Sequence, residues 1–323
     1  MARTTNKGFE AFATYFDRVI EAVEYVIQGK PEVVRLCVVA LFAEGHLLIE
    51  DVPGVGKTML AKTLARSLGC SFRRIQFTPD LLPTDITGVR IWGRQRGGDE
   101  FRPGPIFAQI VLGDEINRAS PKTQAALLES MEERQVTLDG HTYALERPFM
   151  VVATQNPIEH EGTYPLPEAE LDRFLMRVRI GYPEPSAEMD VLSVHALPGR
   201  LDEVEPVISA ANLKKLIDLG HTVHVSDNIK EYIVDLLGHT REHEYAYLGA
   251  SPRAGLMILR AARVLAAADS REYIEPDDVK ELAVAVLAHR IITTPEAQLS
   301  GVTQEAIVAD ALDSTPVPKR ARA

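Results

Sequence analysis

The sequence predicts an α/β domain with a central parallel sheet flanked by helices, followed by an all-α domain. Short apolar runs alternate with helical patterns as far as Gly181, which is typical of parallel strands joined by crossover helices. Beyond about residue 185, helical periodicity dominates and no convincing strand is expected. The length of 323 residues suits about two such domains.

The N-terminal region predicts two helices. Apolar residues recur at spacings of three and four over residues 9–28, as on the buried face of an amphipathic helix. The "GKP" stretch (Gly29–Pro31) ends this pattern, and a second helical run continues to about Ala43.

The strands of the sheet are predicted from short apolar runs. These runs are "HLLIE", "FRRIQF", "AQIVLGD", "PFMVVAT" and "FLMRVRI", with helices expected from Gly56 and from Ser120. In the last run, apolar residues alternate with Arg177 and Arg179. This period of two favours an edge strand with one solvent-facing side.

The stretch "GYPEPSAE" (Gly181–Glu188) interrupts the strand–helix pattern with two prolines and a glycine. Helices are expected beyond it, with serine N-caps and first-turn prolines. Their ranges are about 188–196, 209–219, 227–239, 252–268 and 276–288, with Ser226 and Ser251 as N-caps and Pro252 and Pro276 in first turns.

These patterns divide the chain into four parts. We expect an α/β domain over residues 1–184 with an insertion at about 78–107, a linker over 185–205, an all-α domain over 206–295 and a C-terminal extension over 296–323. The final "DSTPVPKRARA" lacks a burial pattern and is expected to be flexible.

The overall charge is acidic, with 35 Lys and Arg against 46 Asp and Glu and a formal net charge of −11. This balance disfavours broad nucleic-acid binding, which usually leaves a basic footprint. Cys37 and Cys70 lie in apolar runs, as buried free thiols do in a reducing compartment. No run approaches the roughly 20 apolar residues of a membrane span. We therefore expect no membrane span and a cytoplasmic location.

The stretch "EDVPGVGKT" nearly fits the phosphate-binding P-loop pattern G-x-x-x-x-G-K-[ST]. It lies between a strand and a helix whose first backbone N–H groups would point at phosphate. Lys57 is expected to reach the outer phosphates and the Thr58 hydroxyl to bind Mg²⁺. The alternative is a glycine turn with an exposed lysine. The predicted nucleotide-binding residues here are Asp51, Val52, Pro53, Gly54, Val55, Gly56, Lys57, Thr58 and Met59.

Asp51 stands where the pattern has its first glycine. A carboxylate aimed at phosphate would be repelled, so we expect the Asp51 side chain to point away from phosphate or to cap the turn.

Two acidic residues, Asp114 and Glu115, directly follow an apolar strand in "IVLGDEIN". In a P-loop enzyme the first carboxylate holds the Mg²⁺ hydration shell, and a neighbouring Glu polarises the attacking water. Adjacent carboxylates repel each other, which favours a nearby cation. The alternative is an acidic exit from the strand into a loop.

A further strand end carries amides in "FMVVATQNP", at Gln155 and Asn156. An amide at this position is expected to orient the attacking water or to contact the γ-phosphate. The alternative is an Asn that caps the loop before Pro157.

Together these residues carry a resemblance to a known family. The stretches "EDVPGVGKT", "DEINRASPKTQAALLESMEERQVT", "ATQNPIEHEGTYPLPEAELDRF" and "GASPRAGLMILRAARVLA" resemble the MoxR branch of the AAA+ ATPases over roughly residues 9–295. A residue such as Asp51 in place of the first glycine is familiar in this branch. The resemblance implies the following roles: Lys57 and Thr58 as Walker A contacts, Asp114 and Glu115 as Walker B with Glu115 the catalytic base, and Asn156 as sensor 1.

The resemblance also implies two arginines that act on the γ-phosphate. Arg173 in "LDRF" matches the arginine finger, which reaches the nucleotide of the neighbouring subunit. Arg253 in "SPRA" matches sensor 2 on the helical lid. The alternatives are an ion pair of Arg173 with Asp172 or Glu170, and simple solvation of Arg253.

The adenine pocket and the insertion are matched less closely. AAA+ proteins carry an apolar turn before the first strand, which makes Val26 and Ile27 the candidates, although Gln28-Gly29 stand in the reverse of the usual order. The segment 78–107 resembles the insertion that this branch carries before Walker B, with "GRQRGGDE" as a hairpin tip that lines the pore and touches substrate. The alternative is a solvated hairpin.

The function that the resemblance implies is hydrolysis of Mg-ATP by a homo-oligomeric ring, a hexamer. The ring would have a chaperone-like role, remodelling or maturing client proteins or metalloenzymes, often with a von Willebrand factor A-domain partner. Two alternatives remain, a chelatase-like metal-insertion motor and an ATP-dependent oligomeric switch or scaffold. A nucleic-acid translocase is disfavoured by the acidic balance.

Overall fold

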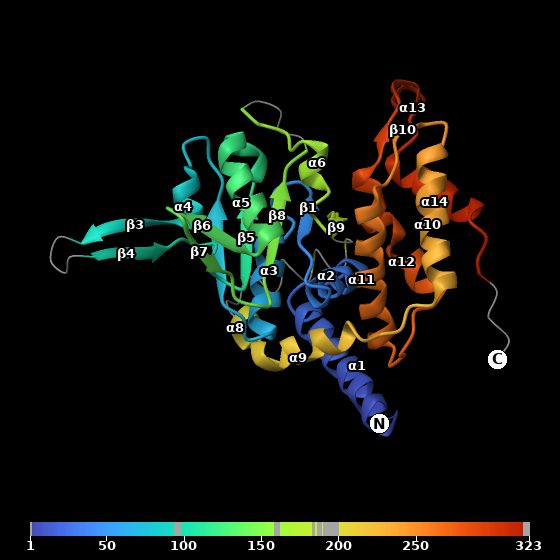
Figure 1. Cartoon of the computed structure of the whole chain (residues 1–323), viewed down its shortest axis with the longest axis horizontal. Helices are drawn as coiled ribbons and strands as arrows, with labels where there is room; N and C mark the ends of the chain where they lie inside the picture. The colour runs from blue at the N-terminus through green and yellow to red at the C-terminus, as the bar shows by residue number, and fades with distance from the viewer. Residues whose placement is uncertain are drawn as a thin grey trace.

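A five-stranded parallel sheet forms the centre of the computed structural model, which describes residues 2–93, 98–157, 162–182, 185, 189 and 200–318. The strand order is β2-β5-β8-β1-β9 (Figure 1). The strands are β1 (Leu47–Glu50), β2 (Phe72–Gln76), β5 (Ile110–Asp114), β8 (Met150–Gln155) and β9 (Met176–Val178). The predicted fold class and the predicted strands are confirmed.

Helices cover both faces of this sheet because successive strand residues point to opposite sides. On β1, Leu47 and Ile49 join a core that includes α1, α2 and α3, while Leu48 joins a second core that includes α5. The helices of the first face are α1 (Ala2–Glu24), α2 (Pro31–Phe42) and α3 (Lys57–Ser67), and α5 spans Pro121–Glu133. The α1 helix ends at Glu24 rather than near residue 28 as predicted.

The C-terminal half is mainly helical, and most of its helices share the first core with the sheet (Figure 1). Ser226 and Ser251 cap their helices as predicted, each accepting a backbone N–H bond from three residues on. The division into domains stays a prediction. The helices are α8 (Arg200–Glu203), α9 (Ala210–Gly220), α10 (Asp227–Glu242), α11 (Pro252–Ala268), α12 (Pro276–Leu287), η2 (Ala288–Arg290), α13 (Pro295–Ser300) and α14 (Gln304–Ser314).

Two short strands correct the prediction that no strand follows residue 185. β10 (Ala246–Leu248) and β11 (Ile292–Thr293) pair antiparallel beside the helices. Strands of two or three residues are too short to show a period of two in the sequence. The helix predicted over 188–196 lies almost entirely outside the described residues.

The edge strand β9 lies at the sheet edge as predicted, but the expected solvent-facing side is partly wrong. The Arg177 side chain is only 12% exposed, because it forms ion pairs with Glu50 and with Glu305 of α14. Helix α14 therefore covers part of this edge.

The C-terminal segment is more ordered than predicted. Asp313 and Ser314 belong to α14, and Thr315 is buried with its hydroxyl donating to the Ala311 carbonyl at 2.6 Å. A polar side chain that satisfies the helix end lets the segment pack without an apolar pattern. Residues 319–323 lie outside the described part.

The insertion forms a hairpin that projects from the body (Figure 1). The insertion comprises α4 (Pro83–Thr87), β3 (Gly88–Gly93) and β4 (Gly98–Pro103). Of the expected tip "GRQRGGDE" (93–100), residues 94–97 lie outside the described residues, and the rest belongs to the ends of β3 and β4. A second hairpin, β6 (Gln135–Leu138) with β7 (His141–Ala144), contacts its base. The Phe101 and Tyr143 rings stack there with centroids 4.0 Å apart.

Among the described residues, none of the helices has the length and apolar character that crossing a membrane requires.

Candidate functional site

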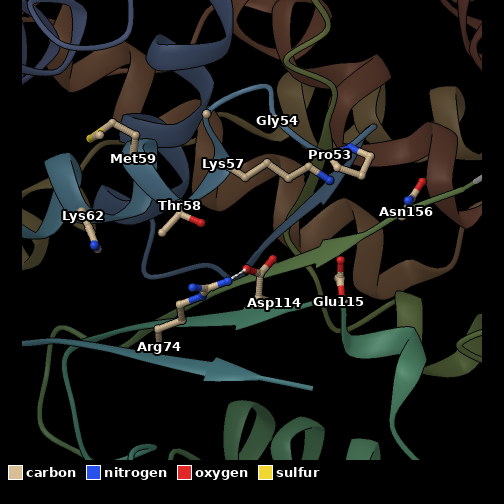
Figure 2. Close-up of a pocket in the computed structure, with 11 residues that line it drawn as sticks. Pro53, Gly54, Lys57, Thr58, Met59, Lys62, Arg74, Asp114, Glu115 and Asn156 are labelled. Carbon is tan, nitrogen blue, oxygen red and sulfur yellow. Dashed lines mark hydrogen bonds and ion pairs between the residues drawn. The ribbon is translucent and has the colours of Figure 1, made fainter. Parts of the chain in front are cut away.

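A cleft of about 420 Å³ opens where the carboxyl ends of the central strands meet the start of α3 (Figure 2). Ligands of open parallel sheets bind at this edge. The lining residues are Pro53, Gly54, Gly56, Lys57, Thr58, Met59, Lys62, Arg74, Asp114, Glu115 and Asn156. The structure thus brings together most of the predicted nucleotide-binding residues with both acids and the amide. Lys62 and Arg74 were not predicted.

The P-loop backbone depends on two glycines in the left-handed region. Gly54 has φ 88° and Gly56 has φ 92°, where a side chain would be strained. Helix α3 begins at Lys57 directly after this turn, so its first N–H groups face the cleft and favour an anion.

Lys57 spans the mouth of the P-loop. Its Nζ donates to the Asp51 carbonyl and, at 3.4 Å, to the Gln155 carbonyl. Partial burial lowers the pKa of Lys57, while nearby carboxylates including Asp114 oppose this change. Figure 2 shows Lys57, Thr58 and Asp114 around the same space. Phosphate oxygens placed there would replace neutral carbonyls as the acceptors for this ammonium group.

Asp51 is buried and turns both carboxylate oxygens into the backbone. Oδ1 accepts from the Val52 N–H at 2.8 Å, and Oδ2 accepts from the Gly181 N–H at 2.6 Å. These contacts agree with the expected capping role. The P-loop is thereby tied to the segment that follows β9. Asp51, Val52 and Val55 are not among the residues that line the cleft.

Thr154, a fully buried residue of β8, fixes the two acids. Its hydroxyl donates to Asp114 Oδ1 at 2.7 Å and accepts from the Glu115 N–H at 2.9 Å. Glu115 itself has φ 56° and ψ 52°, a conformation that non-glycine residues adopt rarely and that often marks a functional site. This role of Thr154 could not be predicted from the sequence, because the contact crosses between the neighbouring strands β5 and β8.

Strand β2 supplies two further contacts that were not predicted. Arg74 Nη2 lies 2.6 Å from Asp114 Oδ2, and Gln76 Nε2 donates to Glu115 Oε2 at 3.0 Å. Arg118 Nε lies 3.2 Å from the same Glu115 oxygen. The i, i+2 spacing of Arg74 and Gln76 puts both on one face of the strand, but only the pairing of β2 with β5 reveals the acids as their partners.

The donor set fits Mg²⁺. Thr58 and Asp114 offer a hydroxyl and a carboxylate oxygen, the hard ligands that Mg²⁺ takes alongside substrate phosphates. Asp114 already accepts a cation at this place, the Arg74 guanidinium. Within the described ranges, no group of three or more His, Cys, Asp or Glu could hold a metal ion by itself.

Replacing Arg74 with Gln is expected to lower the Mg²⁺ concentration needed for half-maximal nucleotide binding by about two- to fivefold, since a half-exposed ion pair contributes about 1 kcal/mol at most. The change removes the cation that competes for Asp114. Titration of a fluorescent ADP at several Mg²⁺ concentrations measures the effect. Arg73→Gln, an exposed neighbour pointing to the opposite face of β2, is the matched control. An unchanged or higher Mg²⁺ requirement in Arg74→Gln would contradict this account.

Asn156 follows β8 directly and is 5% exposed while lining the cleft. Of the two candidates for the adenine pocket, Ile27 approaches the P-loop: a Cβ built on Gly56 would lie 4.0 Å from Ile27 Cδ1. Val26 and Ile27 are both partly exposed, and neither lines the cleft.

The two predicted arginines lie outside the cleft of their own chain. Arg173 follows α6 (Glu168–Leu171) and pairs with Glu170 at 3.1 Å, which is one of the alternatives considered for it. Arg253, in the first turn of α11, pairs with Glu132 of α5.

Comparisons with known proteins agree with this geometry. Residues 46–176 match the family described as "ATPase family associated with various cellular activities (AAA)", and residues 238–311 match the AAA lid domain. The first match contains the P-loop, the acids, Asn156 and Arg173, and the second contains Arg253 and most of α14.

Several whole-chain relatives are similar. The chain is 40% identical to the Mycobacterium tuberculosis protein named "Chaperone MoxR1", over 97% of this chain and 85% of the relative. It is 50% identical to the uncharacterized protein YeaC of Bacillus subtilis, over 93% and 94% of the two chains. It is 31% identical to "Protein MoxR" of Methylorubrum extorquens, over 88% of each. A crystal structure from Cytophaga hutchinsonii superposes with a TM-score of 0.91 at 36% identity, covering 98% of this chain and 99% of that one.

Proposed function

Because this chain belongs to the MoxR family of AAA ATPases, we propose that it hydrolyses Mg-ATP in the P-loop cleft and uses the hydrolysis to remodel a partner protein. Nucleotide binding and ATP hydrolysis are properties of the family. We propose in addition the roles of single residues, the binding of Mg²⁺, the assembly of a ring and the action on a client protein.

The observation that carries the proposal is the convergence of five side chains in one cleft. Lys57, Thr58, Asp114, Glu115 and Asn156 come from three separate segments, yet all line it. Lys57 and the N–H groups of α3 would bind the phosphates. Asn156 would orient the attacking water or contact the γ-phosphate. A glycine turn with an exposed lysine would not need two acids and a buried amide beside it.

Thr58 and Asp114 would hold Mg²⁺, which when bound neutralises charge on the phosphate oxygens. The Thr154 hydroxyl orients Asp114 for this role by donating to Oδ1. Asp114 Oδ2, which accepts from Arg74, would then exchange the guanidinium for Mg²⁺. Gly54 and Gly56 let the backbone approach the phosphates closely. Val26 and Ile27 remain the proposed contacts for the base.

Glu115 would accept a proton from the attacking water. Its carboxylate is held by Gln76 and paired with Arg118, whereas its backbone is fixed by Thr154. The proposal therefore requires the side chain to leave these partners for water, while the strained backbone keeps the residue at the strand end.

Arg173 and Arg253 would complete the cleft of a neighbouring subunit. Each pairs with an acid outside the cleft of its own chain, and each would exchange that partner for phosphate oxygens. Members of the AAA family typically oligomerise, and we propose a hexameric ring with one nucleotide at each interface. The insertion hairpin would face the pore and touch substrate.

The client work is proposed from the relatives. One of them is named a chaperone, and that name supports a role in maturing other proteins or metalloenzymes, with a von Willebrand factor A-domain partner. The cytoplasmic location also stays a proposal.

The ring and the client are tested together with a Glu115→Gln variant purified from the organism that encodes the chain. Light scattering is expected to show the monomer assembling into a hexamer on addition of Mg-ATP. The assembled variant is expected to retain a defined protein that a Lys57→Ala variant does not retain. Retention of no protein would contradict remodelling and favour the switch alternative. A retained metalloenzyme that gains its metal only during ATP hydrolysis would instead favour metal insertion.

A further inference from the structure

The buried Arg290, at the end of η2, contacts the backbone on both sides of Arg173. Its Nη2 donates to the carbonyl oxygen of Asp172 at 3.2 Å and to that of Phe174 at 2.5 Å. These are the residues on either side of Arg173. The Arg290 Nε also donates to Asp172 Oδ1 at 2.7 Å. One guanidinium thus fixes the backbone both before and after the proposed arginine finger.

Asp172 also connects the Arg173 segment to Arg253. Its carboxylate accepts from the Ser251 hydroxyl, with Oγ 3.3 Å from Oδ2 and 3.4 Å from Oδ1. Ser251 is the N-cap of α11, and Arg253 lies in the first turn of that helix. Asp172, which directly precedes Arg173, therefore also contacts the start of the helix that carries Arg253.

The Asp172 carboxylate is held by the buried, charged guanidinium of Arg290. The Arg290 side chain is 2% exposed, and its burial lowers the pKa of Arg290 to about 10 against the opposing effect of Asp172. The guanidinium still carries its charge at neutral pH. A buried cation needs its carboxylate partner, so the geometry around Arg173 depends on Asp172.

We infer that Asp172 and Arg290 are positioning residues, which hold Arg173 and Arg253 in one geometry toward a neighbouring subunit's γ-phosphate. The inference rests on the proposed function, because Asp172 and Arg290 act only through the proposed roles of Arg173 and Arg253. Arg290 lies in η2, which continues directly from α12. A movement of the helical part would therefore shift Arg173 together with Arg253.

The competing reading is an ion pair that only stabilises the fold. Glu305 offers a matched control, because it also joins the β9 segment to the helical part, through ion pairs with Arg177 and Arg179 rather than with Arg173. Glu305→Gln and Asp172→Asn each remove one carboxylate charge from a comparable pair. A purely structural role predicts that both variants lose stability and that neither loses turnover selectively.

The test measures kcat and KM for ATP, together with thermal unfolding, in full-length Asp172→Asn. We expect kcat to fall about 100-fold, as misplacement of a reacting group by about 1 Å does, with KM unchanged. Glu305→Gln is expected to keep both constants. The double variant Asp172→Asn with Arg173→Ala should lose no more than Arg173→Ala alone, because the two changes act on one step.

Each outcome decides the inference. Additive losses in the double variant, or unchanged kcat in Asp172→Asn, would overturn it. If Asp172→Asn does not fold, Arg290→Lys is measured in the same way, since it keeps the charge but loses the planar fork. Full turnover in Arg173→Ala would instead refute the proposed arginine finger, and with it the basis of the inference.

Discussion

Replacing Glu115 with Gln is expected to lower ATP turnover by about 10²- to 10⁴-fold, the usual contribution of a general base, while nucleotide binding is retained. The amide keeps the shape of the side chain but cannot accept the proton of the attacking water. The contacts of Lys57, Thr58 and Asp114 with the cleft are left intact. Steady-state phosphate release measures turnover, and titration with a fluorescent ATP analogue measures binding.

Glu129→Gln is the control for this change, because Glu129 is an exposed acid on the nearby helix α5. It should leave both turnover and binding as they are. Turnover in Glu115→Gln within a fewfold of the unaltered protein would show that another group activates the water.

Loss of the arginine finger should have an effect of similar size. Arg173→Ala is expected to lower turnover by about 10³-fold or more, because an arginine from a neighbouring subunit stabilises charge that develops on the transferred phosphoryl group. Binding of ATP should change little, since Arg173 does not line the cleft of its own chain. The free energy of unfolding should change by only about 1 kcal/mol, because the loss is confined to one partly buried pair with Glu170.

Arg179→Ala serves as the matched control. This arginine lies just beyond β9, is 62% exposed and pairs with Glu50 rather than with the Arg173 segment. Its removal should leave phosphate release unchanged. If Arg173→Ala and Arg179→Ala released phosphate at equal rates, the role of Arg173 would be excluded.

The parts of the fold that the sequence predicted are those written in local patterns. Apolar runs of strand length and three- and four-residue helical spacings marked the sheet and the main helices, and Ser226 and Ser251 marked helix starts. The P-loop and the acids at Asp114 and Glu115 were also recognisable, since each occupies consecutive positions beside a strand.

Contacts between distant segments could not be predicted in this way. Arg74 and Gln76 meet the acids only because β2 pairs with β5, and Thr154 meets them only because β8 lies on the other side. Asp172 and Arg290 are separated by 118 positions in the chain. The strands β10 and β11 are too short to leave a pattern.

The central claim is that each ATPase site combines Glu115 of one subunit with Arg173 of its neighbour. Mixing Arg173→Ala subunits with Glu115→Gln subunits tests this claim most directly. In a mixed ring, an Arg173→Ala cleft that lies beside a Glu115→Gln neighbour has every required group. The account predicts phosphate release well above that of either variant alone, with a maximum near equal proportions. Release no greater than the weighted average of the two variants at every ratio would contradict it.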